Sequence, residues 1–134
     1  MKPTPLDGEP VDDPLDRRVA LAKWLTAPEN EGFARNVVNR MMAHYLGRGL
    51  VDPVDDMRAT NPPSNPALMA ALVADFRESK FNIKHLMRRI MHSRLYQLDS
   101  QPTPANQADT RFYSHFRVKR LSAEPLLEIG RAHV

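Results

Sequence analysis

Cysteine is absent from the sequence, and long apolar runs are absent as well. The lack of cysteine excludes disulfide bridges, thiol nucleophiles, zinc sites with cysteine ligands and covalent c-type haem attachment to this chain. It leaves the compartment open, because exported proteins can also lack cysteine. No apolar stretch approaches the roughly 20 residues that a membrane-spanning helix needs, so we expect no membrane span. The opening MKPTPLDGEPVDD has no apolar signal region, so Met1 is either a cytoplasmic start or an internal methionine of a longer protein.

Positive charge exceeds negative charge only slightly. The 19 Lys and Arg residues against 16 Asp and Glu give a net charge of +3, which is weak evidence for a nucleic-acid partner. Hydrophobic residues make up 42% of the 134 positions, which excludes a disordered chain and suffices for one domain with one core. Most prolines cluster at 3–14, 53–66 and 102–104, between the helical patterns.

Capping residues and apolar spacing predict a mostly α fold: a single-domain bundle of about four main helices, long ordered loops and a truncated fifth helix. The helices are expected after Asp16, from about 32 to 46, after Asn65, after Asn82 and after Ser122. Trp24 is predicted to lie in the core. Residues 98–110 read as a polar linker, and the partial alternation in FYSHFRVKRL favours an extended segment.

The second expected helix carries an unusual polar stripe. Its apolar residues come in adjacent pairs, and between them lie only Arg, Asn and His, without an acid. Two aspartates follow after a glycine-marked turn. One hypothesis is an anion site, since arginine pairs well with carboxylates and phosphates. The other, which we favour, is a polar joint that holds the long loop against the helix. The candidate residues of either are Arg35, Asn39, Arg40, His44, Asp55 and Asp56.

The remaining motifs predict no catalytic residue and no cofactor or metal site in this chain. A lone Asp-Asp pair is too weak a signal for catalysis. None of the five histidines forms an H-x-x-x-H or H-E-x-x-H motif. His85 and His92 share a helix with a basic face that would repel a metal ion, and this face is either solvated or a docking surface for an anionic partner. The basic residues of that face are Lys84, Arg88 and Arg89.

Several blocks of the sequence, in order, resemble a known family. They are DRRVALAKWLTAPEN, FARNVVNRMMAHYLGRGLVDPVDDM, NPPSNPALMAALVADF, FNIKHLMRRIMHSRLYQ and RVKRLSAEPLLE. The chain resembles the C-terminal domain of unknown function of planctomycete cytochrome-c-associated proteins. The family pattern around a-R-v-x-x-N-R-x-W falls on Arg35, Asn39 and Arg40, and its Asp-Asp block on Asp55 and Asp56. Met42 or its neighbour stands where the family often has tryptophan.

The resemblance implies a helical domain over 16–128, preceded by an extended lead-in over 1–15. It also implies export to the periplasm or beyond, with haem c held by a domain upstream of this chain. It brings no established reaction. The family continues past SAEPLLE differently from IGRAHV, and the codons of a common sequencing adapter translate as E-I-G-R-A-H-V. We therefore expect residues 129–134 to be adapter read-through.

These observations favour a non-catalytic structural or interaction module of a larger exported, cytochrome-associated protein. Its partners would be other domains of the same polypeptide, with an anionic ligand as a further option. The alternative is part of an extracytoplasmic enzyme, hydrolytic or redox, that acts on an anionic substrate through the stripe and the two aspartates.

Overall fold

A computed structural model describes Thr4, Pro10 and residues 16–132. The regular structure of this part of the chain is helical throughout and contains no strand, which confirms the predicted fold class. Most of the expected lead-in, and the last two residues of the expected adapter tail, lie outside the described residues. The helices are α1 (Arg17–Leu25), α2 (Glu31–Leu46), α3 (Pro66–Glu78), α4 (Ile83–Met91) and α5 (Ala123–Ala132).

Side-chain caps set where the first four helices begin. Asp16, Asn65 and Asn82 accept hydrogen bonds from backbone N–H groups of the first turns of α1, α3 and α4, as predicted. Asn30 caps α2 in the same way, so this helix begins one residue before the predicted Gly32. Gly47 ends α2 with a φ of 76°, a left-handed conformation that glycine adopts without steric cost.

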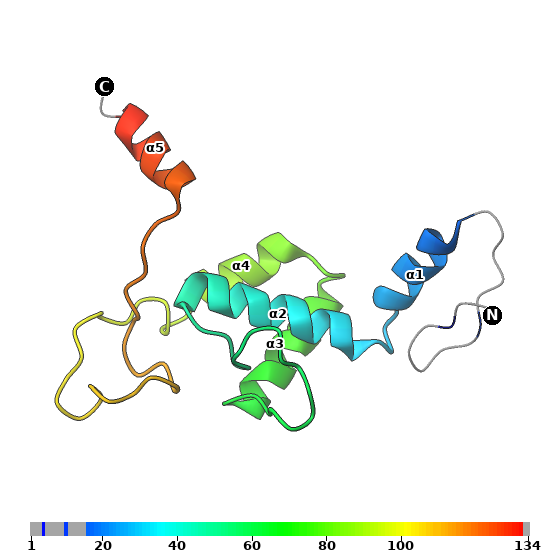
Figure 1. The fold of residues 1–134 in the computed structure, drawn as a ribbon, viewed down its shortest axis with the longest axis horizontal. Helices are drawn as coiled ribbons and strands as arrows, with labels where there is room; N and C mark the ends of the chain where they lie inside the picture. Colours follow the sequence, from blue (N-terminus) through cyan, green and yellow to red (C-terminus); the bar gives the residue numbers. More distant parts are fainter. Residues whose placement is uncertain (1–3, 5–9, 11–15, 133–134) are drawn as a thin grey trace.

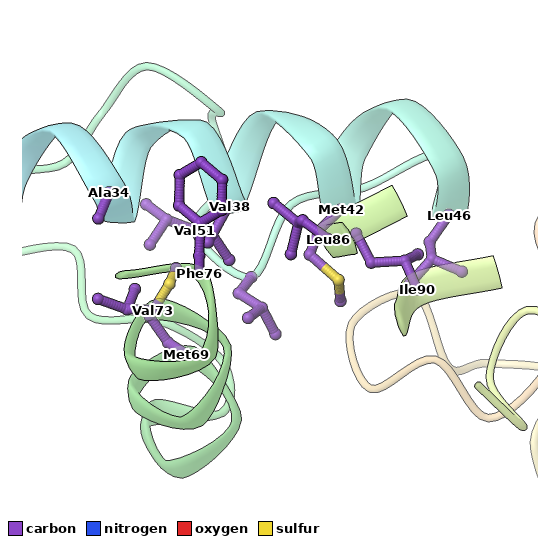
Figure 2. Packing of buried hydrophobic residues seen from close by; sticks show 11 residues of the cluster. Ala34, Val38, Met42, Leu46, Val51, Met69, Val73, Phe76, Leu86 and Ile90 are labelled. Atoms are coloured by element: carbon purple, nitrogen blue, oxygen red, sulfur yellow. The ribbon is translucent and has the colours of Figure 1, made fainter. Parts of the chain in front are cut away.

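The core lies where α2 packs across α3 and α4. Figure 2 shows the buried side chains of α2 directed toward those of the other two helices, with Val51 of the following loop among them. Burial of this apolar surface is the main favourable term holding the three helices together. The core residues are Ala34, Val38, Met42, Leu46, Leu50, Val51, Met69, Val73, Phe76, Leu86 and Ile90.

The turn between α3 and α4 is held by aromatic packing. Lys80 and Phe81 both have positive φ, at 56° and 57°, which is unfavourable for residues with a side chain. The Phe81 ring lies 5.5 Å from that of Phe76 and 5.8 Å from that of Phe33. These contacts compensate the backbone conformation and fix α4 beside α3.

Helix α1 differs from the prediction, because it contributes no buried residue. Val19 and Leu21 are 47% and 51% exposed, and Trp24 is only half-buried and lies outside the core. Figure 1 shows α1 set apart from the central helices, where no other described element covers it. Helical spacing alone could not reveal this, since an apolar face forms a core only where a second element packs on it.

The segment after α4 turns repeatedly as far as residue 115, and residues 116–122 then run without a turn or bend to α5 (Figure 1), so the extended segment expected in FYSHFRVKRL is found in its second half. The Asp109 carboxylate accepts hydrogen bonds from the N–H groups of Arg111, Phe112 and Ser114. Hydrogen bonds from the Ser114 side chain and these backbone groups hold the pKa of Asp109 well below its usual range. The carboxylate therefore stabilises a local turn over residues 109–114, which includes the start of FYSHFRVKRL.

Helix α5 stands at the far end of the molecule from α1 (Figure 1). Its residues 123–131 are all exposed, including Leu126, Leu127 and Ile129. The helix continues through Ala132, so residues 129–132 of the expected adapter tail extend α5 and contact no core residue. No helix in the described part of the chain is long and apolar enough to cross a membrane.

Candidate functional site

Asn39 lies at the centre of the predicted polar stripe, and it is completely buried. The loop covers this residue, so Asn39 faces the loop as the polar-joint hypothesis expects. Its side-chain NH₂ donates to the carbonyls of Val51 and Val54, at 2.9 and 3.1 Å. Its carbonyl oxygen accepts from the Val51 N–H at 2.8 Å. Asparagine carries both donor and acceptor, so one side chain satisfies both the N–H and the carbonyl of the buried Val51.

Gly49 permits this close approach of helix and loop. A Cβ at position 49 would lie 2.6 Å from the Val51 carbonyl and 2.7 Å from the Asn39 side-chain oxygen. Real Cβ atoms are not found at such distances, so a side chain would displace the loop or the amide. The sequence marks Gly49 only as a helix stop, and its packing role appears in the tertiary structure.

Arg40 forms the ion pair between stripe and loop. Its guanidinium contacts the Asp55 carboxylate, and its Nε donates to the Asn36 side-chain oxygen at 3.0 Å. The side chains of Arg40 and Asp55 are 55% and 75% exposed. Solvent therefore screens the pair, and we expect it to contribute under about 1 kcal/mol.

Asp56 turns away from the stripe and pairs with Arg58. The Arg58 Nε and Nη2 atoms donate to the two carboxylate oxygens at 2.6 and 2.8 Å. The hydrogen bonds from Arg58 hold the pKa of the Asp56 carboxyl below its usual value, and the same contact raises the pKa of Arg58. The two aspartates thus have different partners and do not form one carboxylate pair.

Arg35 and His44 lie outside this joint. The Arg35 guanidinium forms no hydrogen bond or ion pair with a described residue, and it lines a pocket with Pro62 and Pro63 at the start of α3. The expected contact of Arg35 with residues 51–57 is not formed. His44 is exposed, and its ring packs edge-on against Tyr45 at 4.9 Å.

The contacts around Asn39 therefore show which candidate residues already have partners within the fold. Asn39 uses its donors and its acceptor on the loop backbone, while Arg40 and Asp55 neutralise each other. Within the described part of the chain, no three His, Asp or Glu side chains lie close enough to hold a metal ion. The arrangement is suited to fastening the loop, and Arg35 remains the cation of the stripe that is available to an anion.

A second set of contacts, which no sequence motif indicated, holds the segment after α4 against the end of α2. Arg48 pairs with Asp52 at 2.9 Å and donates to the Thr110 carbonyl at 2.6 Å. The Tyr113 hydroxyl donates to the Arg48 carbonyl at 3.0 Å. Burial raises the pKa of Tyr113 to about 12. The contacts of Arg48 with Thr110 and Tyr113 join residues more than sixty positions apart, which no local pattern could predict.

A third cluster lies between α3 and α4. The Asp75 carboxylate contacts the His85 Nε2 atom at 2.9 Å and the Arg89 Nε atom at 3.5 Å. The basic face of α4 was predicted from the sequence, but its acidic partner on α3 was not. Asp75 directly precedes the buried Phe76 on another helix, so its position beside α4 follows from packing.

The fold and the joint define a small helical domain in which a buried asparagine fastens a long loop to the central helix. The chain belongs to the family described as PSD1, protein of unknown function (DUF1553), whose model matches residues 17–129. No curated protein and no solved structure gives a significant match to the chain.

Proposed function

We propose that this domain is a non-catalytic structural or interaction module of a larger exported, cytochrome-associated protein. In this proposal α1 and α5 are the elements that pack against neighbouring parts of the polypeptide, and the core of α2, α3 and α4 is the rigid body between them. Export and the cytochrome association are supported by the family resemblance of the sequence blocks, and they belong to the proposal alone.

The observation that carries the proposal is the exposed apolar side of α5. Leu126 and Leu127, which precede the expected adapter tail, are each more than half exposed, and residues 123–131 of this helix include no buried side chain. Isolated helices of this length are marginal in water, because most helical stability in proteins comes from packing of an apolar face. An amphipathic helix of ten residues is therefore suited to packing on another protein surface.

The use of the polar joint within the fold supports a structural role. Asn39 is hydrogen-bonded to the loop backbone at Val51, and Arg40 is paired with Asp55. The alternative, an enzyme acting on an anionic substrate through these residues, has less support. A substrate would have to displace Asp55 from Arg40, and Asp56 would have to leave Arg58.

The proposal is tested by hydrogen exchange on this chain alone and on the whole polypeptide that its source gene encodes. We expect the amides of residues 123–128 to exchange rapidly in the isolated chain and to be protected in the longer protein. The double variant Leu126→Asp with Leu127→Asp should abolish that protection, because it places charge on the apolar side of α5.

Glu128→Gln is the matched control, since it changes a polar position on the same helix. It should leave the protection unchanged. Equally rapid exchange of residues 123–128 in both proteins would refute the role of α5 as a packing element. A reaction catalysed by the whole protein and lost on Arg40→Ala would favour the enzymatic alternative.

A further inference from the structure

An open pocket of about 490 Å³ lies between α3 and α4, away from the joint around Asn39. Its charged rim comes mainly from α4. Residues 85, 88, 89 and 92 are spaced three or four apart, so their side chains follow one side of the helix. The lining includes Leu68, Leu72, Asp75, His85, Arg88, Arg89, His92 and Ser93.

Positive charge exceeds negative charge at this rim. Asp75 is the single acid of the lining, and one of its oxygens, Oδ2, contacts both His85 and Arg89. The side chains of Arg88 and His92 form no hydrogen bond or ion pair with any described residue. Two basic groups are thus held in place by a carboxylate, and two more are available to a ligand.

The floor of the pocket is apolar. Leu68 and Leu72 of α3 are partly buried against the core and also line the pocket, together with Ala71. The unpaired Arg88 guanidinium and His92 ring beside an apolar floor suit a ligand that has an anionic end and an apolar end. A bare inorganic ion would use only the rim and leave the leucines in contact with water.

The polar groups favour binding over nucleophilic chemistry. Ser93 is the hydroxyl of the lining, and it donates to the Ile90 carbonyl at 2.6 Å. The same oxygen accepts from the Tyr96 N–H at 3.4 Å. The hydroxyl is therefore engaged in ending α4, and His85 faces Asp75 instead of the serine.

We propose that the α3–α4 pocket binds a small organic anion, an oxyanion group carried on a compact apolar body. Arg88 and His92 contact the oxyanion through charge-assisted hydrogen bonds, and Leu68 and Leu72 contact the apolar body. Asp75 orients the His85 ring and the Arg89 guanidinium at the rim. This inference does not depend on the packing role proposed for α5.

The test is a titration of the full chain followed by NMR, with phenyl phosphate and benzoate as probes. We expect saturable shifts at His92 and at the Leu72 methyl groups at millimolar probe concentration. At matched ionic strength, inorganic phosphate and benzyl alcohol should bind more weakly than either probe, since one lacks the apolar body and the other lacks the charge.

The double variant Arg88→Gln with His92→Gln removes both charge-assisted contacts and should weaken probe binding by more than about tenfold, the effect of losing one of them. Both positions are exposed, so the variant should keep the helical circular dichroism of the parent. Lys84→Gln is the control, because it removes a positive charge from α4 outside the pocket, and it should leave binding unchanged.

Three outcomes would overturn the proposal. They are the absence of saturable shifts for both probes, binding of inorganic phosphate as tight as that of phenyl phosphate, and an equal loss of binding in the Lys84→Gln variant. The last outcome would mean that the general positive charge of α4, and no defined pocket, attracts the anion.

Discussion

Replacing Asn39 with alanine removes three hydrogen bonds at once, two to carbonyls and one from a backbone N–H. Two of these backbone groups belong to Val51, which is buried as completely as Asn39 itself. Val54 is half-buried, so water can replace the lost contact there. The variant therefore leaves the N–H and the carbonyl of Val51 without this partner in the dry interior.

The loss of folding stability can be estimated from the two backbone groups of Val51. A buried polar group deprived of its partner costs about 1–3 kcal/mol, so the two groups of Val51 together predict a loss of about 3 kcal/mol. That is on the order of a hundredfold in the unfolding equilibrium, a large part of the stability of a small domain. The loop 50–57 should also exchange its amides faster than the helices do, because its attachment to α2 is lost.

Urea unfolding followed by circular dichroism at constant temperature measures this loss. Asn39→Leu separates packing from hydrogen bonding, because leucine restores the volume but bonds neither Val51 group. It should be nearly as unstable as the alanine variant. Asn36→Ala is the control on the same helix, since Asn36 bonds only the exposed Arg40 side chain, and it should cost under about 1 kcal/mol.

The reasoning fails if Asn39→Ala unfolds within about 1 kcal/mol of the parent chain, the range expected for an exposed contact. It also fails if leucine restores full stability, because the side-chain volume would then account for the effect. Unchanged exchange in residues 50–57 would show that the loop is held by contacts other than Asn39.

Three further predictions concern other parts of the fold. Gly49→Ala should be strongly destabilising in the same urea assay because of its close contacts, whereas Gly130→Ala, with open space around it in α5, should be neutral or raise helicity. A double-mutant cycle of Arg40→Ala and Asp55→Ala should give a coupling under about 1 kcal/mol, and a larger value would show a pair more buried than its exposure indicates. Burial raises the pKa of Tyr113 from 10.0 to about 12, so its stabilisation is complete below pH 10 and is lost as the pH rises through about 12. Ultraviolet titration should show a tyrosine ionising near pH 12, and Tyr113→Phe should remove that step; a titration unchanged by the substitution would contradict the burial argument.

The local elements of the fold could be predicted from the sequence because their causes are local. Asp16, Asn65 and Asn82 cap helices through side chains that reach N–H groups two or three residues away. Gly47 ends α2 through its own backbone conformation. The prediction of a mostly α fold depended on these short-range interactions and on apolar spacing, and both can be recognised without knowing the partner surface.

The candidate site was only partly predictable. The stripe identified Asn39, Arg40 and Asp55, and these residues do meet in the structure. The sequence could not distinguish the buried Asn39 from the exposed Arg40, which are neighbours along the chain. Their difference arises because α3 and the loop cover one side of α2 and leave the next side open.

Only the tertiary structure decided which apolar faces are covered and which charges meet. Val19 and Leu21 follow a helical pattern much as Val38 and Met42 do, yet α1 remains exposed because no described element packs on it. The contact of Asp75 with His85 and Arg89 likewise requires the turn at Lys80 and Phe81 that brings α4 back beside α3. The sequence by itself determined the helices and their caps, because those depend on neighbours within a turn. The core, the Asn39 joint and the α3–α4 pocket depend on contacts between segments that meet only when the chain has folded.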